Sequence, residues 1–378
     1  MNLFLAGVIV INLLVIGYVS QRLYRLFHSK MMTLIPTLIA VIFIATHLFG
    51  FNTIIGLSWL SAYGYGLLLC AFFIHFIMDI GMLLTRIVSR FRLSMPVKRT
   101  GYLIALFALF ATGVYSALIP KTTHYNIHLN KASNLEKLRI VQLTDIHINE
   151  YTGRHYIERL VERTNALQPD LVVITGDTLD NQLKPYLDQN LAPLFAQLNA
   201  KYGVVAVFGN HEYYGIARMP DNSMSDVLGA FKAGQLVMLQ DSRWQLPNSN
   251  IVIIGRDDYA AYLIGKQRES LDSLLKNINT QHDITILLDH QPYNLAEAAN
   301  ANIDIMFSGH THGGQIFPGT LIVNKMYQNP VGLYQQQRES GQTFSSIVSQ
   351  GYGLWGPPIR LMTRAEIVVA DITFNSAN

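Results

Sequence analysis

The sequence is poor in charged residues and almost without cysteine, and both shortages limit what the protein can be. Aspartate, glutamate, lysine and arginine make up 14% of its 378 residues, whereas about a quarter is usual for a soluble globular protein. The single cysteine, Cys70, excludes an intramolecular disulfide and a zinc site built from several thiolates. The formal net charge of +3 is small and comes largely from short basic loops, so it does not indicate nucleic-acid binding.

The excess of apolar residues lies before residue 120. Four segments there are long and apolar enough to cross a bilayer, which takes about 20 residues; they are 3–20, 32–52, 58–85 and 102–119. The first has no basic residue before it and no small-residue cleavage site after it, so we interpret it as a retained helix. We therefore predict four transmembrane helices within 1–119 and one globular domain over 120–378.

Basic residues between these segments predict the orientation. The loop after the first segment carries Arg22, Arg25 and Lys30, and the loop after the third carries five basic residues between 86 and 99. Because basic loops stay in the cytoplasm, both are expected there. The N-terminus and the globular domain are then expected outside the cytoplasm, in a multi-pass protein of the cell (inner) membrane.

Two ionisable residues interrupt the third apolar segment. His75 and Asp79 are four residues apart and therefore share one helix face. Ionisable groups within a membrane are costly and often functional. The alternative, which we favour, is that they pair with a neighbouring helix, or that Asp79 lies near the interface beside Arg86.

The second part of the chain has a mixed α/β pattern. Strand-like apolar runs alternate with helical patterns at first, and strands predominate towards the end. This order predicts stacked mixed β-sheets flanked by helices, with ligands beyond the strand ends. The strands that matter below are 138–143, 171–175, 203–208, 284–288 and 303–307, and helices are predicted over 156–167, 186–198 and 268–278.

A short polar motif follows each of those five strands. The motifs are Asp-Ile-His at 145–147, Gly-Asp-Thr-Leu-Asp at 176–180, Gly-Asn-His-Glu at 209–212, Asp-His-Gln-Pro at 289–292 and Gly-His-Thr-His at 309–312. Each one alone is weak, but five in succession predict a shared site for two divalent metal ions. The predicted ligands are Asp145, His147, Asp177, Asn210, His290, His310 and His312.

The ligand types restrict the metal and the chemistry. Asp145 and His147 alternate on what we expect to be an extended tip, and Asp177 can bridge two ions through its two oxygens. Nitrogen and oxygen ligands without thiolate suit Mn, Fe, Zn, Co or Ni better than calcium. Gly176 and Gly309, like Gly209, are expected to allow the tight turn before each ligand.

Two adjacent cations favour hydrolysis of a phosphate ester. They neutralise phosphoryl oxygens and acidify a shared water, so that hydroxide forms near neutral pH. His211 as an imidazolium could protonate the leaving oxygen, with Asp180 holding its ring. Arg256 and Arg360 are candidates for gripping the substrate phosphate, although either could equally be a structural ion pair.

The five motifs together resemble the calcineurin-like metallophosphoesterase superfamily, and the resemblance covers most of 138–375. It implies a metallophosphoesterase catalytic domain with an α/β sandwich fold. By this resemblance Asp177 would bind both metal ions. His211 would lie at the leaving group, oriented by Asp180. Each ion would also have ligands of its own. The first ion would be held by Asp145, His147, Asp177 and His312, and the second by Asp177, Asn210, His290 and His310.

Longer stretches around the fifth motif and at 351–360 resemble a membrane-associated subgroup, the transmembrane proteins with a metallophosphoesterase domain. One position departs from the family pattern: Asp289 stands where an apolar residue is usual. It could orient a ligand histidine or lie exposed.

We therefore expect a membrane-anchored phosphohydrolase with two divalent ions and a phosphoester or pyrophosphate substrate, lipid-linked or at the bilayer surface. A second reading is a lipid-nucleotide pyrophosphatase similar to the UDP-diacylglucosamine hydrolases, which act on the cytoplasmic side. A third is a sensor that binds phosphate compounds without turnover, but such a site has no need for His211 and Asp180.

Overall fold

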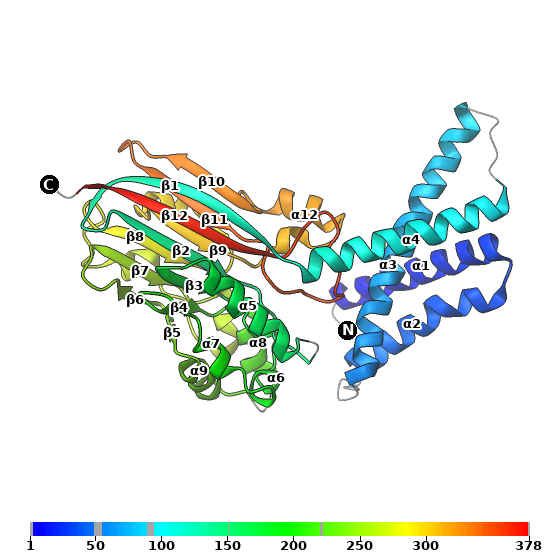
Figure 1. The fold of residues 1–378 in the computed structure, drawn as a ribbon, viewed down its shortest axis with the longest axis horizontal. Helices are drawn as coiled ribbons and strands as arrows, with labels where there is room; N and C mark the ends of the chain where they lie inside the picture. The colour runs from blue at the N-terminus through cyan, green and yellow to red at the C-terminus, as the bar shows by residue number, and fades with distance from the viewer. Residues whose placement is uncertain (1–2, 49–54, 89–93, 151, 220–221, 377–378) are drawn as a thin grey trace. The chain divides into compact units, whose positions relative to one another are not determined.

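The chain forms two compact units in the computed structural model. The structure describes residues 3–48, 55–88, 94–150, 152–219 and 222–376. One unit comprises Met1–Leu118 with Gly356–Ile359, and the other comprises Ile119–Trp355 with Arg360–Asn378. The first is built mainly of helices and the second holds all the β-strands of the described chain (Figure 1).

The helical unit contains four helices among the described residues. They are α1 (Leu3–Phe27), α2 (Lys30–Leu48), α3 (Ile55–Val88) and α4 (Met95–Leu118). In the described part of the chain, two stretches are long and apolar enough to cross a membrane: Trp59–Leu84 of α3 and Met95–Leu118 of α4. A shorter apolar helical stretch covers Lys30–Phe43. Two of the four predicted spans therefore have this support, and the other two remain predictions.

Polar residues within the helical unit pair with one another. The Asp79 carboxylate accepts a hydrogen bond from the Tyr18 hydroxyl at 2.6 Å and lies 2.6 Å from the Arg22 guanidinium. The buried His75 ring stacks on Tyr102, with ring centroids 4.5 Å apart. Asp79 thus pairs with α1, the neighbouring-helix arrangement that we favoured from the sequence. The predicted basic loop of 86–99 falls partly on residues 89–93, which lie outside the described residues.

Two six-stranded sheets form the second unit, as the sequence predicts. The first sheet has the order β1–β12–β2–β3–β4–β5 and the second has β10–β11–β9–β8–β7–β6. In the first sheet the strands are β1 (Lys121–Ser133), β12 (Glu366–Ser376), β2 (Lys137–Leu143), β3 (Leu171–Thr175), β4 (Val204–Val207) and β5 (Leu236–Met238). In the second sheet they are β10 (Gly332–Gln337), β11 (Thr343–Val348), β9 (Ile305–Ser308), β8 (Ile284–Leu288), β7 (Ile251–Gly255) and β6 (Ser242–Gln245).

Both sheets are mixed. Strands β2 to β5 run parallel, as do β7, β8, β9 and β11, while β12 is antiparallel to β2 and β10 is antiparallel to β11. The sheets face each other across one core, to which Ile140, Val173 and Val205 contribute from the first sheet and Ile253 and Phe307 from the second. Their side chains are fully buried. Burial of each such side chain stabilises the fold by about 1.5–3 kcal/mol.

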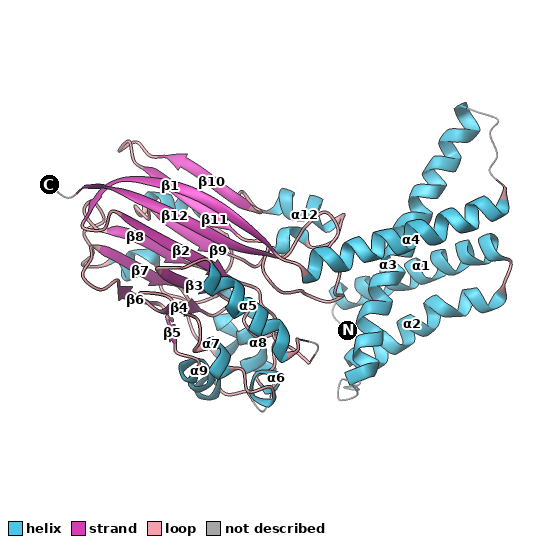
Figure 2. Cartoon of the chain, in the orientation of Figure 1, coloured by secondary structure: helices cyan, strands magenta, loops and turns pink. Residues whose placement is uncertain are grey.

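Helices flank the sheets and are easily followed by colour in Figure 2. The described helices of this unit are α5 (Arg154–Ala166), α6 (Lys184–Asp188), α7 (Ala192–Phe195), α8 (Asn210–Arg218), α9 (Met224–Ala233), η2 (Tyr259–Ile264), α10 (Leu271–Leu275), α11 (Leu295–Asn300), η3 (His312–Gly314) and α12 (Gly319–Met326). Two predictions of long helices were wrong. The predicted helix 186–198 is split into α6 and α7, because Asn190 adopts a left-handed backbone with φ of 49° between them. The predicted helix 268–278 is limited to α10.

The loops after β2, β3, β4, β8 and β9 meet at one edge of the paired sheets, hereafter the rim. Hydrogen bonds join them: the Asp145 N–H donates to the Gly176 carbonyl at 3.0 Å, and the Gly309 N–H donates to the His290 carbonyl at 2.9 Å. The Gln142 side chain links the two sheets by donating to the Ser308 carbonyl at 2.8 Å. Because parallel strands end at the same edge, five separate sequence motifs are brought to one place.

Candidate metal centre

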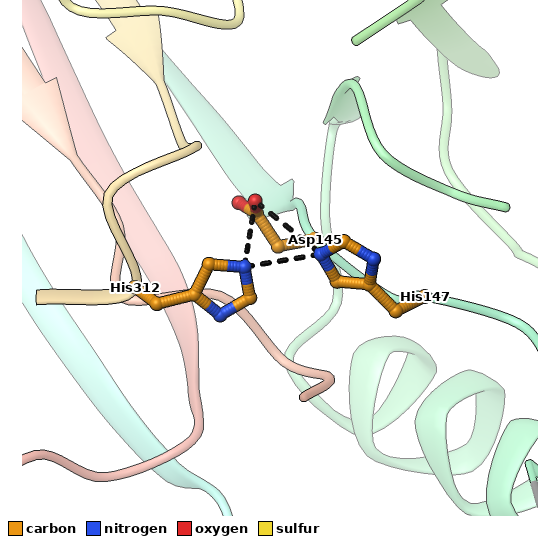
Figure 3. A group of neighbouring side chains, drawn as sticks. All are labelled: Asp145, His147 and His312. Carbon is orange, nitrogen blue, oxygen red and sulfur yellow. Dashed lines mark hydrogen bonds and ion pairs between the residues drawn. The ribbon is translucent and has the colours of Figure 1, made fainter. Parts of the chain in front are cut away.

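The first group of predicted ligands lies between the two sheets. Asp145 and His147 follow β2, and His312 follows β9 in the other sheet. The Nε2 atoms of His147 and His312 lie 3.0 Å apart, and the His312 Nε2 lies 3.2 Å from a carboxylate oxygen of Asp145. Figure 3 shows the three side chains converging on one point. Two donor atoms bound at about 2.1 Å to one ion lie roughly 3 Å apart, so this spacing fits a shared cation.

The second group contains Asp177, His290 and His310, whose donor atoms also lie close enough to share one ion. The His290 Nε2 lies 3.1 Å from Asp177 Oδ2, and the His310 Nδ1 lies 2.8 Å from the Asn210 side-chain oxygen. Asp177 Oδ2 is also 3.8 Å from the His147 Nε2 of the first group. The carboxylate of Asp177 therefore stands between the two groups, where the sequence places a bridging ligand.

His211 and Asp180 form a pair beside these groups. The His211 Nδ1 lies 3.1 Å from Asp180 Oδ1, and the same oxygen lies 3.5 Å from the His147 Nδ1. The His211 side chain is 12% exposed and thus nearly buried. Its ring is also near enough to His147 and Asp177 to join a third group of candidate ligands. The predicted role at the leaving group remains a prediction.

The backbone at the ligands departs from what the sequence suggested. We expected Asp145 and His147 on an extended tip, but both have left-handed backbones, with φ of 51° and 50°. The same conformation occurs at Asp177, His310 and His312, with φ of 51°, 67° and 50°. It is uncommon outside glycine, although aspartate and histidine adopt it more often than most residues. Strained backbone of this kind gathers at functional sites.

The glycines before the ligands serve two different purposes. Gly176 has φ of 89°, so the expected turn is present there. Gly309 does not adopt a left-handed backbone; instead a Cβ atom would overlap the side chains of Thr144 and Asp145. Gly209 is like Gly309, since a Cβ atom would overlap Asp177. The turn explanation was therefore wrong for Gly209 and Gly309, where close packing against ligands requires glycine.

The electrostatics of the rim match a cation-binding site. Burial lowers the pKa of His310 and of His312 to about 4, which keeps both rings neutral and able to donate a lone pair. Burial opposes a charge on His290, but the carboxylates of Asp177 and Asp145 outweigh burial and raise its pKa well above the ordinary value. The buried Nε2 of His290 has no hydrogen-bond partner among the described residues besides its ion pair with Asp177. The donor set therefore fits two divalent ions, which would supply the positive charge that these carboxylates attract.

Glu212 is a residue whose importance the sequence reasoning missed. Its buried carboxylate accepts three backbone N–H groups, from Leu179 at 2.8 Å, Gly209 at 2.8 Å and Asp177 at 3.1 Å. It thereby binds the loop after β3 to the start of α8. Burial and the charge of Asp177 raise its pKa to about 7. Its place as the fourth residue of the third motif was the only signal in the sequence.

Asp289 fits neither alternative that its sequence position suggested. It is buried rather than exposed, and it pairs with Arg268. The ring of His290 is oriented instead by the Thr175 carbonyl, 2.7 Å from its Nδ1. Burial raises the pKa of Asp289 to about 6, although Arg268 opposes this change. Asp289 thus belongs to an ion pair behind the rim.

The two candidate arginines are engaged with the protein. Arg256 pairs with Glu297 at 3.1 Å. Arg360 is fully buried and donates to the carbonyls of Gln350, Gly353 and His312, at 2.8, 2.7 and 3.3 Å. These contacts suit a structural role, with Arg360 supporting the loop of a predicted ligand. A role of either residue in phosphate binding remains a prediction.

Known proteins are similar to this chain over the region that holds the motifs. The family model of calcineurin-like phosphoesterases matches residues 138–314, a range that contains all seven predicted ligands. An uncharacterized metallophosphoesterase of Aquifex aeolicus is 34% identical over 274 residues, covering 71% of this chain and 98% of the relative. One from Campylobacter jejuni is 32% identical over 272 residues, covering 71% of this chain and 67% of the relative.

A vertebrate relative is also similar to this chain. The Danio rerio protein named "transmembrane protein with metallophosphoesterase domain" is 33% identical over 267 residues, covering 67% of this chain and 57% of the relative. The chain belongs to the calcineurin-like metallophosphoesterases, and it is a metallophosphoesterase hydrolase with its metal-ligand residues in place.

Proposed function

We propose that this protein is a membrane-anchored phosphohydrolase that uses two divalent metal ions to cleave a phosphoester or pyrophosphate, on a lipid or at the membrane surface. The observation that carries the proposal is the sharing of Asp177 between two groups of ligands, with the His211–Asp180 pair beside them. When bound, the two ions would polarise phosphoryl oxygens and acidify a water molecule.

The chain's own residues account for the other parts of the reaction. Burial opposes protonation of His211, but Asp177 and Asp180 outweigh it and raise the pKa of His211 to about 9. Bound cations would lower this value, since like charges disfavour the imidazolium. His211 in its protonated form can donate to the departing oxygen, while Asp180 holds the ring by its Nδ1. A site that only binds phosphate has no use for this pair, which disfavours a non-catalytic sensor.

A hydrolysis screen of the purified full chain tests the activity. The protein is supplied in turn with Mn, Fe, Zn, Co and Ni and offered nitrophenyl monoesters and diesters, nucleotides, phospholipids and lipid pyrophosphates. We expect metal-dependent turnover of at least one lipid phosphoester or pyrophosphate. Metal loading without hydrolysis of any ester would overturn the enzyme proposal and favour a phosphate-binding sensor.

The membrane part of the proposal comprises four spans, with both ends of the chain outside the cytoplasm. It is supported by the apolar stretches of α3 and α4, by the basic residues of 21–30 and 86–99, and by the named membrane relative. A C-terminal alkaline-phosphatase fusion should be active, and a fusion truncated near residue 95 inactive. A C-terminal fluorescent protein that matures only in the cytosol should be dark. A bright fusion would contradict the orientation and favour the cytoplasmic lipid-nucleotide pyrophosphatase.

A further inference from the structure

A group of exposed apolar side chains lies next to the metal rim. It consists of Leu321, Ile322 and Met326 on α12, together with Trp355 and Met362, and is called the apolar patch below. Each of these five side chains has between 57% and 81% of its surface exposed. None of the residues of α12 is buried. A short helix that buries nothing gains little stability from the fold, so its apolar residues need another explanation.

Hydrogen bonds around Gln315 hold the parts of the patch together. The Gln315 side chain donates to the Trp355 carbonyl at 2.7 Å and accepts the Trp355 N–H at 2.9 Å. The Gln315 carbonyl accepts the N–H of Leu361, the neighbour of Met362, at 3.0 Å. Because Gln315 follows the fifth motif by only three residues, the patch is fixed to the loop that carries His310 and His312.

The C-terminal end of α12 also lies near one of these predicted ligands, His310. Tyr327 directly follows the helix and is buried, with its ring centroid 6.3 Å from that of His310. At the near end, Arg360 supports the His312 loop and lies two residues before Met362. The patch is therefore bounded on both sides by contacts to predicted metal ligands, and whatever covers it lies close to His310 and His312.

The chain passes three times between its two units. The three crossings are Leu118 to Ile119, Trp355 to Gly356 and Ile359 to Arg360. Two residues separate the end of α4, an apolar helix of 24 residues, from Lys121 at the start of β1. Lys121 is held at the rim end of β12 by its N–H, which donates to the Ala365 carbonyl at 2.9 Å. The start of β1 at the rim is thus joined to an apolar helix by a link of two residues.

The two segments that carry the patch contain basic but no acidic residues. Segments 309–331 and 351–364 have no aspartate or glutamate and contain Lys325, Arg360 and Arg364, of which Arg360 is buried. Lys325 is exposed next to Met326 on α12. Tryptophan and aliphatic side chains beside lysine or arginine are typical of surfaces that lie in the headgroup region of anionic membranes.

From these observations we propose that the apolar patch inserts into the surface of a phospholipid bilayer and presents the rim to phosphates of membrane-embedded substrates. The proposal rests on the membrane part of the proposed function and narrows its substrates to lipids whose phosphate lies at the interface. A soluble phosphoester would still reach the site, but without help from the patch.

Site-directed spin labelling of the full chain in anionic phospholipid nanodiscs tests the insertion without any need for activity. The chain has one cysteine, so Cys70→Ala provides a background for single labels. Nitroxides at Leu321→Cys and Met326→Cys should collide more with oxygen than with a water-soluble nickel chelate. A label at Gln281→Cys, exposed before β8 and hence at the opposite end of that strand from the rim, should show the reverse.

The accessibility of the spin labels decides between insertion and its alternatives. Labels on the patch that behave like the Gln281→Cys label would overturn insertion. Labels shielded from both reagents would also overturn it, because they would show that protein rather than lipid covers the patch. Lipid-exposed labels in a protein without hydrolytic activity would support insertion while the proposed enzyme fails, so the two proposals can fail separately.

A comparison of hydrolysis rates on embedded and soluble phosphoesters tests whether the patch helps the site to reach lipid substrates. Leu321→Glu should lower the ratio of the rate on a vesicle-embedded phosphoester to the rate on a soluble nitrophenyl ester by about tenfold, since burial of a leucine-sized side chain contributes about that much to partitioning. Leu187→Glu, at an exposed position on α6, is the matched control and should leave the ratio unchanged. An equal fall of the ratio in both variants, or in neither, would contradict a role of the patch in reaching lipid substrates.

Discussion

The two groups of predicted ligands differ in how far the protein encloses them. Asp145, His147 and His312 are all buried, whereas His310 of the second group is partly exposed. Asp145 is further held by the Thr144 hydroxyl at 2.8 Å and by the His310 N–H at 3.0 Å. From this difference we expect the first position to hold its ion more tightly and the second to be more open to solvent and substrate.

Asp177 links the two groups of ligands. Its replacement should therefore weaken metal binding at both positions and remove the difference between them. In Asp177→Asn the bridging position loses its charge, so both ions should be held less tightly. We expect near-complete loss of activity together with loss of both metals, measured by elemental analysis of the folded variant. Wild-type metal content in that variant would contradict the bridging assignment.

Separate removal of one histidine from each group should give unequal results. His310→Ala opens the second position only, so we expect one ion to remain per chain and to resist dialysis against a weak chelator. His312→Ala removes a ligand of the enclosed position, so the retained ion should be held less tightly. Equal metal retention in the two variants would mean that enclosure does not determine affinity.

His211 belongs to neither group in this account, and its replacement should spare both ions. His211→Gln should keep metal content but lower the maximal rate by roughly 10²–10⁴, the range of general-acid effects. Nitrophenyl esters, whose leaving group needs little protonation, should lose less rate than alkyl esters. If all esters slow equally, His211 does not assist the leaving oxygen.

The smallest effects should come from residues that support the loops of the ligands. Glu212 fixes the loop of the bridging Asp177, and Arg360 fixes the loop of His312. Glu212→Gln should weaken metal binding at both positions by about 10–100-fold. Arg360→Lys leaves carbonyls without donors and should destabilise folding by about 1–3 kcal/mol, with the first position affected. Metal titrations and thermal unfolding of both variants would show whether Glu212 acts on both ions and Arg360 on the first ion alone.

The sequence was sufficient to bring the candidate ligands together. Each ligand follows a run of Val, Ile or Leu, and such runs become parallel buried strands whose ends share an edge. The sequence could not predict the left-handed backbones at Asp145 and Asp177, because neighbouring loops impose them. It also gave no sign that Arg360 would turn inwards to the His312 loop, since that contact depends on tertiary packing.

The two-sheet architecture was predictable from the sequence, but some elements, among them one edge strand and one helix, were not. The two mixed sheets follow from the apolar runs, but β1 was missed because only its second half has buried apolar residues. Its partner β12 is far away in the sequence, so no local pattern reports the pairing. The predicted helix 186–198 failed for a local reason, the left-handed residue Asn190.

The position of β12 has a consequence for the order in which the protein is made. This strand lies between β1 and β2, and its contacts with β1 join residues 245 positions apart, such as His128 and Thr373. During synthesis β1 and β2 therefore emerge long before the strand that must enter between them. The first sheet stays open until residues 366–376 are available, so the metal-binding unit closes only after nearly all of the chain has been made.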